Sequence, residues 1–181
     1  GLYRYYPSKE AIFVALQQRA IDAFAQAQAE AMACEQTQVG DERVRALRRA
    51  HASFQFFLEQ ADRAPTHHAL VDAFLSAPSP TLSDAQAQAI DAYLGPVLRV
   101  CAESLDAAVA VGALEPGDSL ARTHVLWASL HGLDHFRKRD RIQPVALRVA
   151  ALARTLFRTA FVGWGGAPEA VDAALGGLEG P

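Results

Sequence analysis

The sequence predicts an all-α protein, a helical bundle of about six or seven helices. Alanine and leucine dominate its 181 residues, and apolar residues recur at three- and four-residue spacing along most of the chain. Glycine and proline fall mainly between these periodic segments, and no alternation of the β type persists. A chain of this length is expected to fold as one domain with a sizeable core, or as one domain with a small appendage.

The first two helices are predicted from start signals and apolar spacing. Pro7-Ser8 begins a long helix that is expected to reach the mid-thirties. Its inward stripe is predicted to be Ile12, Leu16, Ala20, Ala23 and Ala27. Gly40-Asp41 then caps a second helix. The inward residues of that helix are predicted to be Val44, Leu47, His51, Phe54, Leu58 and Ala61.

The middle of the chain holds two more helices. Pro65 opens a short one that runs through Leu75, and the Ala-Pro-Ser-Pro sequence at 77–80 ends it. Residues 83–86, Ser-Asp-Ala-Gln, form a capping-box pattern that starts the next helix. Gly95-Pro96 is expected to bend this helix. Its inward residues are predicted to be Ile90, Leu94, Val97, Cys101, Leu105 and Ala108.

Three helices are predicted in the last third. After a break at Gly112 and at 115–117, Asp118 caps a helix that extends to about Arg139. Gln143-Pro144 starts another, which reaches Phe161 or beyond. A short helix is expected from Pro168 to Leu175, and residues 176–181 are expected to form a frayed tail.

Composition and charge narrow the class of protein. No apolar run approaches the roughly eighteen residues of a membrane span, and the N-terminus lacks the apolar stretch of a secretory signal. Cys34 and Cys101 lie in helical patterns, which favours buried thiols over a disulfide. The net charge of −3 is unlike that of a protein that grips DNA over a broad face. We therefore expect a cytoplasmic domain that is not by itself a complete DNA-binding protein.

Two segments carry a resemblance to a known family. The run 2–13, Leu-Tyr-Arg-Tyr-Tyr-Pro-Ser-Lys-Glu-Ala-Ile-Phe, joins a leucine-tyrosine pair, another aromatic residue, a short turn, a lysine and an amphipathic helix. This order resembles the hinge between the recognition helix and the first body helix of TetR-type transcriptional repressors. The run 127–133, Trp-Ala-Ser-Leu-His-Gly-Leu, is preceded by a turn at 112–118. It is similar to a segment in the penultimate core helix of many such regulators.

The resemblance implies a TetR-type ligand-binding and dimerisation domain that lacks most of the helix-turn-helix. Residues 1–7 would be the C-terminal remnant of the DNA-binding domain, 8–175 the effector-binding and dimerisation domain, and 176–181 a flexible tail. Such a repressor binds a small, largely apolar effector and releases operator DNA. The resemblance implies phosphate contacts for Tyr3, Tyr5 and Lys9, residue types that commonly position proteins on DNA without reading bases.

The predicted pocket and dimer interface follow from the helical pattern. Several aromatic residues beside a Gly-Pro bend predict a ligand cavity, although each candidate is also explained by core packing. The pocket candidates are Phe54, Phe57, Phe74, Tyr93, Val97, Cys101 and Trp127. Small residues on the last two long helices predict a homodimer. The interface candidates are His131, Gly132, Ala146, Ala150, Ala153, Phe157 and Ala160.

Other classes of protein remain as alternatives. A helical ligand-binding or scaffold module that never touches DNA fits the same pattern. His124, His131 and His135 share a helical face near Asp134, but no CxxC or HExxH motif accompanies them, so no metal site or cofactor is expected. The absence of a GxSxG elbow, a glycine-rich phosphate loop and a paired acidic motif gives no reason to expect an enzyme. His67-His68 at a helix start fits either a pocket mouth or a partly exposed site.

Overall fold

The computed structural model describes residues 8–36, 40–76 and 83–176. These residues form seven α-helices and two short 3-10 helices, with no strand among them. The predicted all-α bundle is therefore confirmed.

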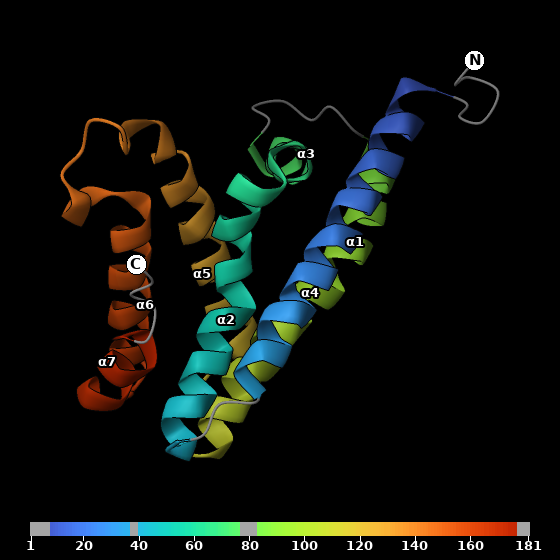
Figure 1. Ribbon diagram of the computed structural model, residues 1–181. Helices are drawn as coiled ribbons and strands as arrows, with labels where there is room; N and C mark the ends of the chain where they lie inside the picture. Colours follow the sequence, from blue (N-terminus) through green and yellow to red (C-terminus); the bar gives the residue numbers. More distant parts are fainter. Residues whose placement is uncertain (1–7, 37–39, 77–82, 177–181) are drawn as a thin grey trace.

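Three long helices and one short helix form one side of the bundle (Figure 1). Helices α1 (Lys9–Gln36) and α4 (Asp84–Ala110) run side by side, and α2 (Glu42–Arg63) packs against both in the opposite direction. The short helix α3 (Pro65–Ser76) crosses the end of the bundle where α1 begins, and it contacts α1 and α2.

The remaining helices cover the other side of α2 (Figure 1). Helix α5 (Ser119–Asp134) returns toward the α3 end, and α6 (Val149–Gly163) packs beside it. The short helix α7 (Pro168–Gly176) closes the opposite end and packs on α2 and α6. Helix α2 therefore lies at the centre of the fold, with neighbours on both sides.

Three predicted caps start their helices as expected. Asp41 Oδ1 accepts a hydrogen bond from the backbone N–H of Arg43 at 2.9 Å, and Asp118 Oδ1 accepts one from Ala121 at 2.9 Å. Ser83 and Gln86 form a full capping box at the start of α4. Each cap pairs amide groups that the first turn of a helix leaves without a partner inside the helix.

Of the predicted inward stripe of α1, Ala20 is fully buried as predicted, but most of the buried face lies about one residue position away. The buried residues are Gln17, Ala20, Ile21, Phe24, Gln28 and Met32. Leu16, which was placed inward, is 41% exposed. Phe24 and Ile21 offer more apolar area for burial than the alanines of the predicted stripe, so the helix turns these larger side chains inward.

The connection between α5 and α6 also differs from the prediction. Helix α5 ends at Asp134 rather than near Arg139, and a 3-10 helix follows at Arg137–Arg139. Helix α6 begins at Val149 rather than at Pro144. Asp140 Oδ1 accepts a 3.0 Å hydrogen bond from the Val149 N–H, so a carboxylate nine residues upstream caps α6.

A contact between two turns joins α6 to the α4–α5 connection. The Glu115 N–H donates to the Trp164 carbonyl at 2.8 Å, and the Arg122 guanidinium lies 5.0 Å from the centre of the Trp164 ring. Gly165 has a φ of 88°, and a side chain there would collide with Glu115. Glycine is therefore required at this turn.

Two expectations from composition are also addressed by the structure. No helix among the described residues combines the length and apolar character needed to cross a membrane. Cys101 is buried as predicted, whereas Cys34 is exposed, and the two do not form a disulfide.

Candidate ligand-binding site

Most of the predicted pocket residues lie inside the bundle, but they do not form one site. Those that are at most 5% exposed are Phe54, Phe57, Val97, Cys101 and Trp127. Tyr93 is 45% exposed on α4, which places it on the surface. The side chain of Phe74 lies outside the described part of the structure.

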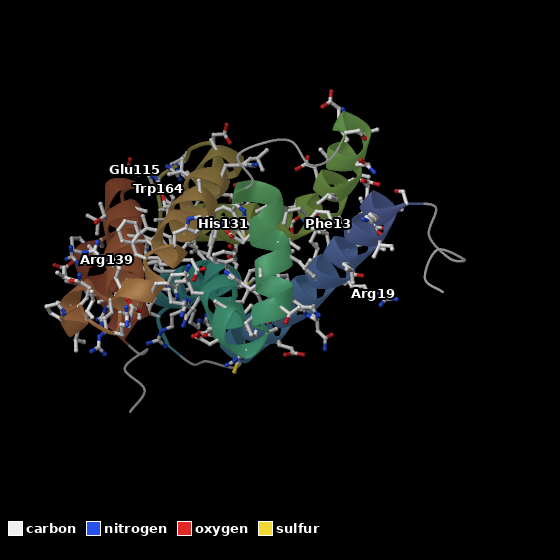
Figure 2. The ribbon with its side chains drawn as sticks, turned by 90° about the horizontal axis from the view of Figure 1, so that it is seen from above. Phe13, Arg19, Glu115, His131, Arg139 and Trp164 are labelled. Atoms are coloured by element: carbon white, nitrogen blue, oxygen red, sulfur yellow. The ribbon has the colours of Figure 1, made fainter. Side chains whose placement is uncertain are left out.

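Phe57 lies at the centre of a cluster of rings from α1, α2, α3 and α5. Its ring centre is 4.3 Å from that of His131, 4.7 Å from that of His68 and 5.0 Å from that of Trp127. The ring of Phe24 lies 6.1 Å from both Phe57 and His68. We call these five residues the Phe57 cluster. Figure 2 shows His131 well inside the bundle, while Arg139 lies toward its edge.

Three members of the Phe57 cluster hold buried polar atoms without a hydrogen-bond partner among the described residues. These atoms are Nε1 of Trp127, Nδ1 of His68 and both ring nitrogens of His131. An unpaired buried polar group costs about 1–3 kcal/mol, and such groups are uncommon in native proteins. Apolar walls with a few convergent polar groups are typical of small-molecule sites. The Phe57 cluster is therefore our candidate site.

A half-buried carboxylate, that of Asp134, fixes the ring of His68. Asp134 Oδ2 lies 2.9 Å from His68 Nε2, and Asp134 Oδ1 accepts a 2.8 Å hydrogen bond from Arg137 Nε. Burial acts to raise the pKa of Asp134, but the hydrogen bonds from His68 and Arg137 outweigh it and lower this pKa to about 2. The ionised carboxylate only accepts hydrogen bonds, so His68 Nε2–H donates and its Nδ1 remains an acceptor.

A second carboxylate lies between two histidines of α5. Asp72 Oδ1 of α3 is 3.1 Å from His135 Nε2 and 3.5 Å from His131 Nδ1. Burial lowers the pKa of His131 to about 4, and the opposing attraction of Asp72 is smaller. His131 is therefore neutral at pH 7, so one ring nitrogen donates and the other accepts.

Two of the three buried histidines in the described structure, His51 and His131, predict a loss of stability in mild acid. Burial also lowers the pKa of His51 to about 4, whereas an unfolded histidine titrates near pH 6.5. Protons therefore bind the unfolded chain first, and stability that is complete above pH 6.5 is lost as the pH falls toward 4. We expect about 2 kcal/mol of loss per histidine by pH 5, measured by urea unfolding. His51→Leu should reduce this loss and the exposed control His124→Leu should not; equal losses in all three proteins would contradict the assignment.

Val97 and Cys101 belong to a different contact, where α1, α2 and α4 meet. Gln28 Nε2 donates to the Ser53 carbonyl at 2.9 Å and to the Val97 carbonyl at 3.1 Å, and it lies 3.2 Å from Cys101 Sγ. Burial raises the pKa of the Cys101 thiol to about 12, which makes it unreactive at neutral pH. These polar groups are paired, as expected of a structural contact.

The predicted dimer residues divide between the surface and the core. Gly132, Ala146 and Ala150 are exposed, and Ala160 is half-buried. Ala153 and Phe157 are 6% and 1% exposed, and the ring of Phe157 packs against those of His51, Phe54 and Phe161. His131 lies in the Phe57 cluster. Within a single chain, therefore, only part of this set is available to a partner.

Large exposed apolar side chains gather on α5 and the segment that follows it. Of eight such residues in the described structure, six lie here: Leu120, Val125, Phe136, Ile142, Val145 and Leu147. A Cβ atom added at Gly132 would meet nothing within 4 Å, so this glycine is open to an approaching helix. We call these seven residues the α5–α6 apolar surface. Exposed apolar groups concentrated in one region are typical of interaction surfaces.

Two of the three predicted phosphate contacts lie outside the described residues, and the histidines weighed as metal ligands do not come together. Lys9 is the exposed first residue of α1, and Tyr3 and Tyr5 lie outside the described residues. His124 is exposed, with Nδ1 2.9 Å from the Leu120 carbonyl, and does not join the other α5 histidines in the cluster. Among the described residues, no group of three histidine, cysteine or acidic side chains is placed to hold a metal ion.

Two open grooves flank the contact between α1 and α2. One has a volume of about 340 Å³ and includes Glu35, Arg45 and Arg49; the other, of about 300 Å³, includes Glu35 and Arg63. Neither is lined by a predicted pocket residue. Their mixed charges are typical of a solvated helix face.

Sequence analysis identified part of the Phe57 cluster and missed the rest. It named Phe57 and Trp127 as pocket residues and His68 as a possible pocket-mouth residue. It assigned His131 to the dimer interface and did not single out Phe24 or Asp72. Gln17, Ala20, Phe24 and Gln28 recur at three- and four-residue spacing along α1, but alanines at similar spacing on the other faces left the inward face undecided.

The chain matches no known protein family, no curated protein and no solved structure. Its function is therefore argued from its own residues and geometry.

Proposed function

We propose that this chain is the effector-binding and dimerisation body of a TetR-type transcriptional repressor, with its effector site at the Phe57 cluster. The observation that carries this proposal is the set of unpaired polar atoms on Trp127, His68 and His131 inside an aromatic core. Trp127 and His131 come from the segment that resembles the penultimate core helix of these regulators. They lie one helical turn apart, so both rings face Phe57.

The α5–α6 apolar surface is the proposed dimer interface. A two-fold homodimer brings the same surface from each copy together, so a self-complementary apolar patch is sufficient. Gly132 leaves open space on α5, which allows the partner helix to approach closely. Of the predicted set, only Gly132 belongs to this surface. Ala146 and Ala150 are exposed but are not among its seven residues, and Ala153 and Phe157 are buried.

Helix α1 offers a route from the effector to DNA. It begins at Lys9, next to the predicted hinge, and carries Phe24 into the Phe57 cluster. A ligand that displaces these rings shifts α1, and with it the spacing of two DNA-binding heads in a dimer. The ligand can favour the release of DNA only to the extent that it binds one spacing of the heads more tightly than the other. This difference in binding free energy is typically about 1–3 kcal/mol.

A ligand-binding module without DNA binding is the second candidate. The net charge of −3 favours it, because phosphate neutralisation supplies much of the affinity for DNA. Both candidates use the Phe57 cluster, and they differ in whether the whole protein binds DNA.

Fluorescence of a single tryptophan tests the effector site. The chain has two tryptophans, so Trp164→Phe leaves Trp127 as the sole emitter. Titration with a panel of small apolar compounds is expected to give a saturable change in Trp127 emission for at least one chemical series. The matched Trp127→Phe variant, which reports only Trp164, should show no saturable change. An unresponsive Trp127 across the panel would contradict the proposed site.

A further inference from the structure

The polar atoms of the Phe57 cluster also specify a class of ligand. We infer that the site takes a neutral aromatic molecule with a hydroxyl group, which accepts a hydrogen bond from Trp127 and donates one to an imidazole of His68 or His131. This inference rests on the proposed effector site and goes beyond it, because the sequence predicts only a small, largely apolar effector.

The hydrogen-bonding roles follow from the partners already present. Trp127 Nε1 can only donate. In a neutral His68 ring Nδ1 is an acceptor, because Nε2–H donates its hydrogen bond to Asp134. In His131, Nδ1 faces Asp72 at 3.5 Å, which is too long for a good hydrogen bond but favours the proton on that nitrogen and leaves Nε2 as an acceptor. The cluster therefore holds two unpaired donors, Trp127 Nε1 and His131 Nδ1, and two unpaired acceptors, His68 Nδ1 and His131 Nε2.

A hydroxyl group matches this set better than the other common polar groups. One O–H both accepts and donates, so it pairs Trp127 and one imidazole at the same time. A carboxylate has no proton to donate to an imidazole, and it would approach Asp72 and Asp134 at the edge of the cluster. A purely apolar ligand would leave every one of these buried atoms unpaired, at about 1–3 kcal/mol for each group.

The rings around these atoms favour an aromatic ligand. Phe24, Phe57 and Trp127 present faces and edges at the separations where aromatic pairs attract one another. The rings are in contact in this structure, so ligand entry requires one of them to turn or α3 to shift. The contacts between α3 and the C-terminal end of α5 at this point are polar: His68 pairs with Asp134, and Asp72 with His131 and His135. Water can pair these groups while α3 moves, so this is the proposed route of entry.

Isothermal titration with phenol, toluene and benzoate tests the inference on the whole chain. Phenol and toluene have nearly the same shape and differ in the hydroxyl group, and benzoate adds a negative charge. We expect phenol to bind about tenfold or more tightly than toluene, since one well-paired polar group is worth roughly that factor. Benzoate should bind more weakly than phenol.

Two variants test whether the preference for phenol over toluene arises at Trp127. Trp127→Phe keeps a ring and removes the donor, so it should lower the phenol-to-toluene ratio at least threefold, and Trp164→Phe should leave the ratio unchanged. Both ratios are compared with the protein folded, because Trp127→Phe also leaves a cavity in the core and is expected to lower the melting temperature whether or not Nε1 has a partner.

The remaining outcomes are also decisive. Equal affinities for phenol and toluene would overturn the hydroxyl requirement and leave the apolar effector site standing. A phenol preference that survives in Trp127→Phe would place the ligand elsewhere and overturn the inference. If neither compound binds, the polar atoms are paired by water alone and the ligand class is wrong. The proposed effector site fails separately, if Trp127 emission responds to nothing in the broader panel.

Discussion

Phe57→Ala is expected to cost about 3–5 kcal/mol of folding free energy, the range for removing a fully buried phenylalanine. Phe57 is 0% exposed, and its ring is the one that His68, Trp127 and His131 share. For a domain of this size the melting temperature should fall by about 10 °C. Ligand binding should also be lost, since the remaining rings no longer have a common neighbour to hold them in place.

Tyr93→Ala is the matched control for this prediction. Tyr93 was predicted as a pocket residue but is 45% exposed, so its removal should change stability by less than about 1 kcal/mol and leave ligand affinity unchanged. Calorimetry and titration of the two variants measure both quantities. If Tyr93→Ala lost as much ligand affinity as Phe57→Ala, the assignment of Phe57 to the site and of Tyr93 to the surface would be contradicted.

Val125→Arg and Gly132→Leu are each expected to weaken the homodimer about a hundredfold, the effect of disrupting a central interface residue. Val125 is 60% exposed in the single chain, and nothing lies within 4 Å of a Cβ at Gly132. Neither change therefore disturbs the fold of one copy. Gly132→Leu should even favour helix α5, because glycine in a helix costs about 1 kcal/mol relative to alanine.

Sedimentation equilibrium at micromolar concentration measures this effect. The unmodified chain should be a dimer, both variants should be monomers with unchanged helical circular dichroism, and Ala92→Arg on the exposed face of α4 should remain a dimer. Ala153→Arg is not a clean test, because Ala153 is buried and the variant would disrupt the core. A monomeric unmodified chain would contradict the proposed interface.

Much of the helix order was predictable because the caps are local signals. The Asp41 cap, the Ser83–Gln86 box and the Asp118 cap each depend on a few neighbouring residues, and each starts a helix in the structure. The inward face of α4 was also predictable, since Ile90, Leu94, Val97, Cys101 and Leu105 repeat large apolar residues at helical spacing and all are buried. Where the start depends on a distant group, as with Asp140 at α6, prediction of the boundary was wrong.

The face of α1 could not be settled from spacing alone. Its alanines occur on every side, so the apolar pattern contains little directional signal. The structure buries two glutamines on this helix, and each has a distant backbone acceptor: Gln17 donates to the Leu70 carbonyl, and Gln28 to that of Ser53. A polar residue becomes suitable for the core only through such a partner, and the partner is known only once the fold is known.

Only part of the candidate site was predictable from the sequence, because its contacts join helices that are distant in the chain. Phe57 and Trp127 are large aromatics in amphipathic helices, so their burial was expected. Their meeting with His68 depends on how α3 crosses the end of the bundle, which no local pattern fixes. Phe54 and Phe57 are nearly one turn apart on α2, yet Phe54 faces Phe157 and Phe57 faces Trp127, so sequence spacing joined residues that belong to different parts of the core.

The claim that this chain serves a DNA-binding repressor is tested most directly by selection of DNA from a random pool. The whole protein that contains this chain should enrich a two-fold symmetric site, with half-sites centred about 34 Å apart. Its affinity for that site should fall steeply as the salt concentration rises. Residues 1–181 alone, which hold only the candidate phosphate contacts Tyr3, Tyr5 and Lys9, should enrich nothing. If the whole protein enriches no symmetric site, the repressor proposal is wrong, and the chain is a ligand-binding module that does not act on DNA.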